Sequence, residues 1–211
     1  MIFRDRVDAG ERLAERLRHH AHAADTVVLG IPRGGIVVGA VIARELGLPL
    51  GICPVRKLGA PGNPELAIGA VDDESGVVVD HNLSRRLGLS EEELQAEADG
   101  TRAELRLWVG KFGQGVARLE PDRQVILTDD GIATGLTAQA AVEAARRRGA
   151  RRVTLAVPVA PKDTADWLSR LVDEWVCLAT PEPFYAVGNF FEHWPQVGDD
   201  EVRSLLTPGN G

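Results

Sequence analysis

The residues best suited to chemistry lie together in Val125–Thr137, which reads VILTDDGIATGLT. Its apolar start predicts the end of a buried strand, and two adjacent carboxylates, Asp129 and Asp130, follow where that strand should stop. Backbone N–H groups of a glycine-containing loop at a helix N-terminus attract a phosphate dianion, and threonine hydroxyls can donate to the same oxygens. Carboxylates accept hydrogen bonds from vicinal ribose hydroxyls. The stretch therefore predicts a site for a phosphorylated sugar.

This stretch resembles the phosphoribosyl-diphosphate (PRPP) motif of the type I phosphoribosyltransferases, an apolar strand, two acids and a loop ending in T-G-x-[ST]. The resemblance implies that Asp129 and Asp130 hold the ribose and act catalytically by favouring a cationic sugar ring. It assigns the 5′-phosphate to the loop residues Gly131, Ile132, Ala133, Thr134, Gly135 and Thr137. The alternative is an ordinary strand–loop–helix turn, but helix capping alone does not require paired acids, two glycines and two threonines in this order.

A second candidate element, I-P-R-G-G, follows the first predicted strand. Gly34 and Gly35 would let the backbone approach a ligand, and Arg33 adds a fixed positive charge. The segment resembles the pyrophosphate loop of the same family, which implies a cis peptide bond between Pro32 and Arg33. A tight turn without a ligand is the alternative interpretation.

A third element is the basic pair Arg56 and Lys57, at the end of the second predicted strand. The resemblance implies that both contact the diphosphate, and that Arg33 and Lys57 favour its departure. An exposed basic pair without a role is the alternative. The residues that follow resemble the start of the mobile catalytic loop of adenine-type members, so we expect residues 59–80 to form a mobile hairpin arm.

The acceptor is only partly constrained. In members that use 6-oxopurines, an aspartate stands before the T-G of the motif, whereas this chain and the adenine-type members have alanine, here Ala133. The alanine argues against hypoxanthine or guanine as the acceptor but does not establish adenine. Membership of an uncharacterised branch of the family is the alternative. The family places a variable hood over the base, expected here at residues 179–211, where Phe184 and Tyr185 could stack on a nucleobase. Packing that anchors this segment is the alternative.

The pattern of the chain predicts an α/β fold, a doubly wound, mostly parallel sheet flanked by helices, because strands and helices alternate. Helices are predicted at residues 10–22, 34–46, 135–148 and 162–172. A further helix is predicted to begin at a capping box formed by Ser90 and Glu93 and to run toward Leu119. Strands are predicted at 26–31, 50–55, 66–71, 77–80, 124–128, 153–157 and 174–178, with a hairpin around 72–76 and a loop at 58–64. Ligands of such a sheet bind at the carboxyl ends of its strands, where the three elements above fall.

Bulk properties set the remaining expectations. The 211 residues are compatible with one domain, and a net charge of −7 argues against nucleic acid as a partner. No apolar run approaches the ~20 residues of a membrane span, and we expect a cytoplasmic protein. His19, His20 and His22 lie in a predicted surface helix without a nearby cysteine or carboxylate at ligand spacing, which favours a solvated face over a metal site.

Taken as a whole, the resemblance implies transfer of a phosphoribosyl group between PRPP and a nucleobase or another nitrogenous acceptor. Mg²⁺ would be the cofactor, held mainly by substrate and water rather than by direct protein ligands. A second copy of the chain is a candidate partner. The alternative is a regulator of the same fold that binds PRPP or nucleotides without catalysis.

Overall fold

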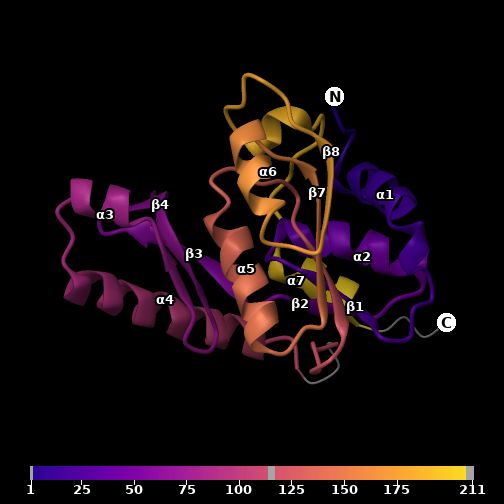
Figure 1. Ribbon diagram of the computed structural model, residues 1–211, viewed down its shortest axis with the longest axis horizontal. Coiled ribbons are helices and arrows are strands. Elements are labelled where there is room, and N and C mark those ends of the chain that lie inside the picture. Colours follow the sequence, from indigo (N-terminus) through magenta and orange to yellow (C-terminus); the bar gives the residue numbers. More distant parts are fainter. Residues whose placement is uncertain (1, 114–116, 208–211) are drawn as a thin grey trace.

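The computed structural model describes residues 2–113 and 117–207, and its centre is a parallel sheet of five strands (Figure 1). The strand order is β2-β1-β6-β7-β8, and every neighbouring pair is parallel. The strands are β1 (Thr26–Gly30), β2 (Leu50–Ile52), β6 (Gln124–Thr128), β7 (Arg152–Val159) and β8 (Glu174–Ala179). The doubly wound sheet predicted from the alternation of elements is confirmed.

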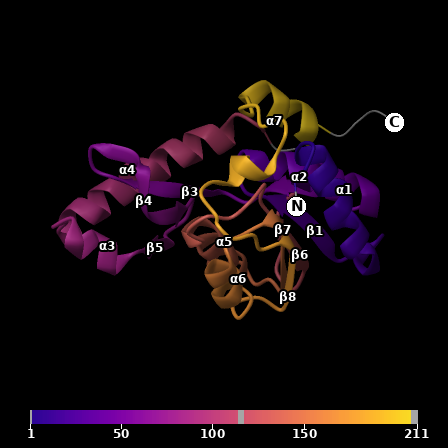
Figure 2. The ribbon, with the colours of Figure 1, turned by 90° about the horizontal axis from the view of Figure 1, so that it is seen from above.

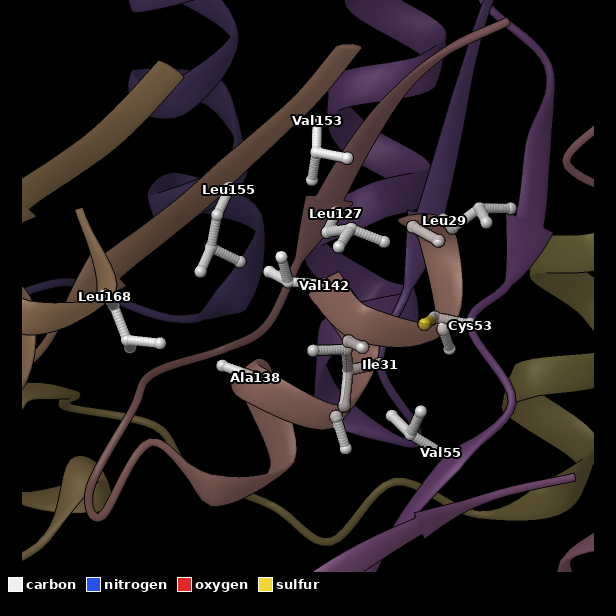
Figure 3. Packing of buried hydrophobic residues seen from close by; sticks show 14 of the residues in the cluster. Leu29, Ile31, Cys53, Val55, Leu127, Ala138, Val142, Val153, Leu155 and Leu168 are labelled. Atoms are coloured by element: carbon white, nitrogen blue, oxygen red, sulfur yellow. The ribbon is translucent and has the colours of Figure 1, made fainter. Parts of the chain in front are cut away.

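Helices cover both faces of this sheet. Helices α1 (Arg6–Arg16) and α2 (Gly34–Leu46) pack on one face, where Leu13 and Ile42 meet Ile126. Helices α5 (Leu136–Arg147) and α6 (Lys162–Leu168) cover the other face, where the alanines of α5 meet residues such as Leu127 and Leu155 (Figure 3). Burial on both faces explains why the central strands read as continuous apolar runs.

A second, antiparallel sheet projects from the side of the first with two helices (Figures 1 and 2). It consists of β3 (Val55–Ala60), β4 (Asn63–Asp72) and β5 (Val77–Val79), with α3 (His81–Arg86) and α4 (Glu91–Gly110) after it. The predicted hairpin around 72–76 and the capping box of Ser90 and Glu93 are confirmed.

The predicted loop at 58–64 is wrong, because β3 and β4 run through it and leave only a turn between them. Leu58 and Ala60 point into the core between β4 and α4, which the glycines and prolines around them concealed. Gly59 lies where the strand register shifts and the backbone of Pro64 comes close, as glycine allows at a bulge.

Several boundaries also differ from expectation. Helix α1 begins at Arg6 and is followed by a short 3₁₀ helix, η1 (Arg18–His20), while α4 ends at Gly110 rather than near Leu119. The strand expected at 50–55 divides between the two sheets at Pro54, which has no N–H to donate to a ladder. Residues 114–116 and 208–211, part of the expected α4 and hood, lie outside the described residues.

The C-terminal part of the described chain returns over the carboxyl edge of the parallel sheet. It contains a 3₁₀ helix, η2 (Val187–Phe190), and α7 (Asp199–Leu206), which packs against α2 and α4 (Figure 2). The N–H of Phe3 donates to the carbonyl of Phe190, so the start of the chain is fastened to the same segment. Among the described residues, no helix is both long and apolar enough to cross a bilayer.

Candidate functional site

The Asp129–Asp130 pair and the I-P-R-G-G segment lie side by side because β1 and β6 are paired in parallel, with Gly30 opposite Thr128. The contact is tight: a Cβ atom at Gly34 would lie 1.6 Å from Oδ2 of Asp130. One at Gly35 would lie 2.4 Å from the carbonyl oxygen of Thr128. Glycine is therefore required at both positions if the acids are to keep their place.

Two helix N-termini open at this edge of the sheet. Neither α2, whose N-cap residue is Arg33, nor α5, whose N-cap residue is Gly135, receives a side-chain capping hydrogen bond among the described residues. The first N–H groups of both helices therefore remain available to an anion. The Pro32–Arg33 peptide bond is cis, as the resemblance implied.

Beside these helix ends lies a cavity of about 590 Å³. Its lining combines segments from the whole chain: Arg6, Ile31, Pro32, Arg33, Gly34, Val55, Arg56, Lys57, Leu105, Trp108, Asp129, Asp130, Thr137, Trp194, Pro195, Gln196 and Val197. The cavity thus brings together the two acids, the basic loop, the basic pair and the last threonine of the motif. A volume of this order is ordinary for a small-molecule site.

Among the charged side chains of the lining, the cations outnumber the two acids, which suits a ligand that carries phosphate groups. Arg33 pairs with Asp199 of α7 at 2.9 Å, and Arg56 pairs with Glu104 of α4 at 3.2 Å. Asp199 also accepts from the indole of Trp108 and from Lys111, and these contacts hold its pKa down at about 2. The arginine of the pyrophosphate-like loop is therefore held by α7, an element that the sequence did not connect with it.

A buried arginine, Arg6, completes the acidic pair and was missed in the sequence. Its Nε donates to Oδ2 of Asp130 at 2.7 Å, and another guanidinium nitrogen donates to the carbonyl of Pro195 at 2.8 Å. Its guanidinium lies 3.7 Å from the ring centre of Trp194. A signal was present: Asp5 caps α1 by accepting from the N–H of Asp8, which would have placed the helix start at Arg6.

The two acids are electrostatically unequal. Burial raises the pKa of Asp129 well above its ordinary value, and the neighbouring charge of Asp130 raises it further. Burial also raises the pKa of Asp130, but the hydrogen bond and charge of Arg6 oppose this shift. Arg6 thus favours the ionised form of Asp130, and the pair is suited to accept hydrogen bonds from a ligand without holding two uncompensated negative charges.

The loop between the acids and α5 lies beside the cavity, whose lining includes none of residues 131–135 but does include Thr137 in the first turn of α5. The N–H of Ile132 donates to the carbonyl of Val159, and Thr164 donates its hydroxyl proton to the carbonyl of Ala133. Thr134 is exposed. These contacts fix the loop so that Gly135, with φ at 82°, can begin α5.

The predicted base-stacking residues are not brought to the cavity. Phe184 packs on Phe190, with ring centres 5.0 Å apart, and Tyr185 is 81% exposed. The aromatic residues in the lining are instead Trp108 and Trp194. The packing interpretation of Phe184 is thus the one that its contacts support, and the cavity wall is supplied further along the same segment.

Comparison with known families and proteins gives a consistent result. A family model described as "Phosphoribosyl transferase domain" matches residues 2–181. A curated Mycobacterium tuberculosis protein, whose name describes it as a candidate phosphoribosyl transferase, is 42% identical over 206 residues. The match covers 97% of this chain and 46% of the relative, so the chain spans about half the length of that protein. Adenine phosphoribosyltransferase of Methylobacillus flagellatus is 34% identical over 66% of this chain and 56% of the relative.

Among solved structures, the crystal structure of TT1426 from Thermus thermophilus resembles this chain with a TM-score of 0.78 and 39% identity. The superposition covers 98% of both chains.

Proposed function

Because the chain belongs to the phosphoribosyl transferase domain family, we propose that its cavity binds PRPP and transfers the phosphoribosyl group to a nitrogenous acceptor. Family membership and fold support the predicted enzyme class, a pentosyltransferase, and the activity and the substrate are both part of the proposal. The observation that carries it is the meeting of the carboxylate pair and two uncapped helix N-termini at one cavity. Each of these features suits one part of PRPP, which is the 5′-phosphate, the ribose or the diphosphate.

In the proposed complex, the N-terminus of α5 and Thr137 receive the 5′-phosphate. The ribose hydroxyls donate to Asp129 and Asp130, whose positions are fixed by Gly34 and Arg6. The diphosphate lies at the N-terminus of α2, among Arg33, Arg56 and Lys57. Positive charge on these side chains favours departure of the negatively charged group.

The proposed reaction exchanges one bond at the anomeric carbon for another. The bond to the diphosphate oxygen breaks with both electrons leaving on oxygen, the acceptor nitrogen donates the pair for the new bond, and its proton passes to solvent. In its ionised form Asp129, which among the described contacts has no arginine on its carboxylate comparable to Arg6, would favour the positive charge that develops on the sugar ring. The protein supplies no covalent nucleophile and acts through positioning and charge.

The residues present are compatible with Mg²⁺ that is held mainly by substrate. Asp129 and Asp130 supply the hard oxygen donors that this ion prefers, but the ion pair with Arg6 and the tight contact with Gly34 leave Asp130 little freedom to coordinate directly. When bound, Mg²⁺ would neutralise charge on the diphosphate and so assist its departure.

The acceptor is proposed to lie against the stretch from Trp194 to Gln196. Trp194, whose ring lies under the guanidinium of Arg6, and Gln196, whose amide can both donate and accept, belong to the lining of the cavity. A planar base with mixed donors and acceptors at its edge suits such a wall. The class of acceptor is thus a nitrogen heterocycle, and its identity within that class is left to experiment.

Titration calorimetry with PRPP and Mg²⁺, followed by a screen of nucleobases for diphosphate release, tests the proposal. We expect saturable binding, a raised Tm because only the folded protein binds, and release with at least one base. Asp130→Asn should weaken PRPP handling by roughly tenfold to a hundredfold, since a charge-assisted hydrogen bond contributes about 1.5–3 kcal/mol. Asp166→Asn, a change in an exposed α6 ion pair, is the control and should have no effect.

The outcomes separate the alternatives. Binding of PRPP without release of diphosphate with any base would support the non-catalytic regulator. Absence of PRPP binding at millimolar concentration would overturn both the enzyme and the regulator.

A further inference from the structure

Two histidines and a glutamate converge at the edge of the sheet opposite the cavity. Nε2 of His19 lies 2.8 Å from one carboxylate oxygen of Glu174, and Nε2 of His20 lies 3.0 Å from the other. The histidines lie in η1, after α1, and Glu174 is the first residue of β8. Because the strands are parallel, this amino edge of the sheet is remote from the carboxyl edge that carries the cavity.

The donor set is that of a borderline metal ion. Two imidazole nitrogens and one carboxylate oxygen are common ligands of Zn²⁺, which often leaves a fourth position to water. The three donors lie within 4.8 Å of one another, and neighbouring ligands of a tetrahedral zinc site stand about 3.3 Å apart. Each histidine nitrogen now lies 2.8 or 3.0 Å from its carboxylate oxygen, so these two contacts need to open by only a few tenths of an ångström to reach that spacing.

The surroundings hold the donors in place on one side and leave them open on the other. His20 is only 5% exposed, so its ring cannot turn freely, whereas the side chain of His19 is 56% exposed and borders solvent. Thr154 donates its hydroxyl proton to Glu174 at 3.3 Å, the kind of outer contact that orients a ligating carboxylate. The rigid His20 and the oriented Glu174 would give an ion a fixed site, and the accessible His19 would give it an entry path.

One neighbouring charge opposes a cation here. Arg152 approaches the same carboxylate oxygen as His20, but at 3.4 Å its contact is the longest in the cluster. Its side chain is 44% exposed and can turn into solvent when an ion takes its place. Arg152 should therefore weaken metal binding without preventing it.

We propose that His19, His20 and Glu174 form a zinc site that fastens the end of α1 and η1 to the start of β8. The family resemblance and the PRPP site are independent of it, since none of the three residues lines the cavity. The ion would act as a structural clamp, because it would link two elements that lie 154 residues apart in the chain.

Titration of the metal-free, untagged protein with ZnCl₂ tests the site. We expect saturable binding of one equivalent, a higher Tm with zinc, and with Co²⁺ in its place the visible absorption of a low-symmetry four-coordinate ion. His19→Ala should abolish these signals, and because His19 is largely exposed the variant should fold. His81→Ala, an exposed histidine at the start of α3, is the matched control and should bind as the parent does.

Arg152→Gln gives the sharper result. Removal of the competing charge should tighten zinc binding several-fold, whereas it has no reason to do so if zinc binds elsewhere. Absence of saturable binding, or binding that survives in either His19→Ala or Glu174→Gln, would overturn the proposal and identify the cluster as a hydrogen-bonded contact only.

Discussion

At the scale of single residues, the site depends on an acidic pair whose charges are costly to bury. The pKa of Asp129 is raised, so the folded protein holds a proton on this group at pH values where the unfolded chain has lost it. The contribution of Asp129 to the free energy of unfolding therefore falls as pH rises above the ordinary carboxyl value of 3.8. A carboxylate that reduces stability in this way is retained for its chemistry, as is common in binding sites.

We predict that Asp129→Asn stabilises the ligand-free protein at pH 7 while it impairs PRPP turnover. The amide is neutral, and its oxygen can still accept from the N–H of Asp130, as the carboxylate does at 2.8 Å. The gain in the free energy of unfolding should shrink as pH falls from the raised pKa of folded Asp129 toward the ordinary carboxyl value of 3.8, below which the carboxyl is protonated in the folded and the unfolded state alike. Thermal melts at several pH values measure this, with a rise in Tm of a few degrees expected at pH 7.

Asp199→Asn should change the free energy of unfolding in the opposite direction to Asp129→Asn. Hydrogen bonds from Trp108 and Lys111, against slight desolvation, lower the pKa of Asp199 to about 2, so its ionised form stabilises the fold above pH 4. This variant should be less stable than the parent at pH 7, and the difference should fade as pH falls through about 2. Equal effects of the two substitutions would contradict the electrostatic interpretation.

At the scale of elements, the two turns of the projecting antiparallel sheet differ in how many contacts hold them. The acidic turn between β4 and β5 is fixed by Arg147, the last residue of α5, which pairs with Asp72, and by the C-cap residue Arg148, which pairs with Asp73. The turn between β3 and β4 has no such anchor among the described contacts, and a Cβ atom at Gly62 would meet nothing within 4 Å. If an arm closes over the cavity, its moving end is therefore the β3–β4 turn rather than the acidic turn.

Hydrogen exchange should distinguish these two turns. We expect the amides of residues 59–64 to exchange rapidly in the free protein and to become protected with PRPP and Mg²⁺, because β3 carries Arg56 and Lys57 to the cavity. The amides of residues 72–76 should be protected already and change little. Protection of 59–64 that is high without ligand and unaltered by it would argue against a closing arm.

At the scale of the whole molecule, local patterns predicted the fold and the part of the site that is local in sequence. The Asp129–Thr137 stretch and the loop with Arg33 are recognisable from residue types within a few positions. Arg6 and Trp194 could not be found in this way, because their roles arise only where distant segments meet. His19 and His20 were likewise judged without Glu174, which folding brings to them.

The C-terminal hood, residues 179–211, is another part of the site where local sequence did not show which residues line the cavity, and it yields a further prediction. Gln196→Ala should raise the KM for the acceptor roughly twofold to tenfold, since a hydrogen bond contributes about 0.5–1.5 kcal/mol, with PRPP affinity unchanged. Tyr185→Ala, in the same segment but outside the cavity lining, is the control and should leave acceptor kinetics unaltered. Steady-state kinetics with the acceptor varied measure both, and an effect of Tyr185 alone would restore the assignment of the base to that residue.

The contact from Arg6 to Pro195 spans 189 residues, and it has a consequence for the time at which the protein becomes competent during its synthesis. The ribosome releases Arg6 first and Asp130 later, while the segment that completes the arginine's surroundings emerges last. Until then Asp130 lacks the settled position of its partner Arg6, although the helix ends that we propose to bind phosphate have already emerged. Under that proposal, a nascent chain would have the residues that hold phosphate before it has a finished ribose site.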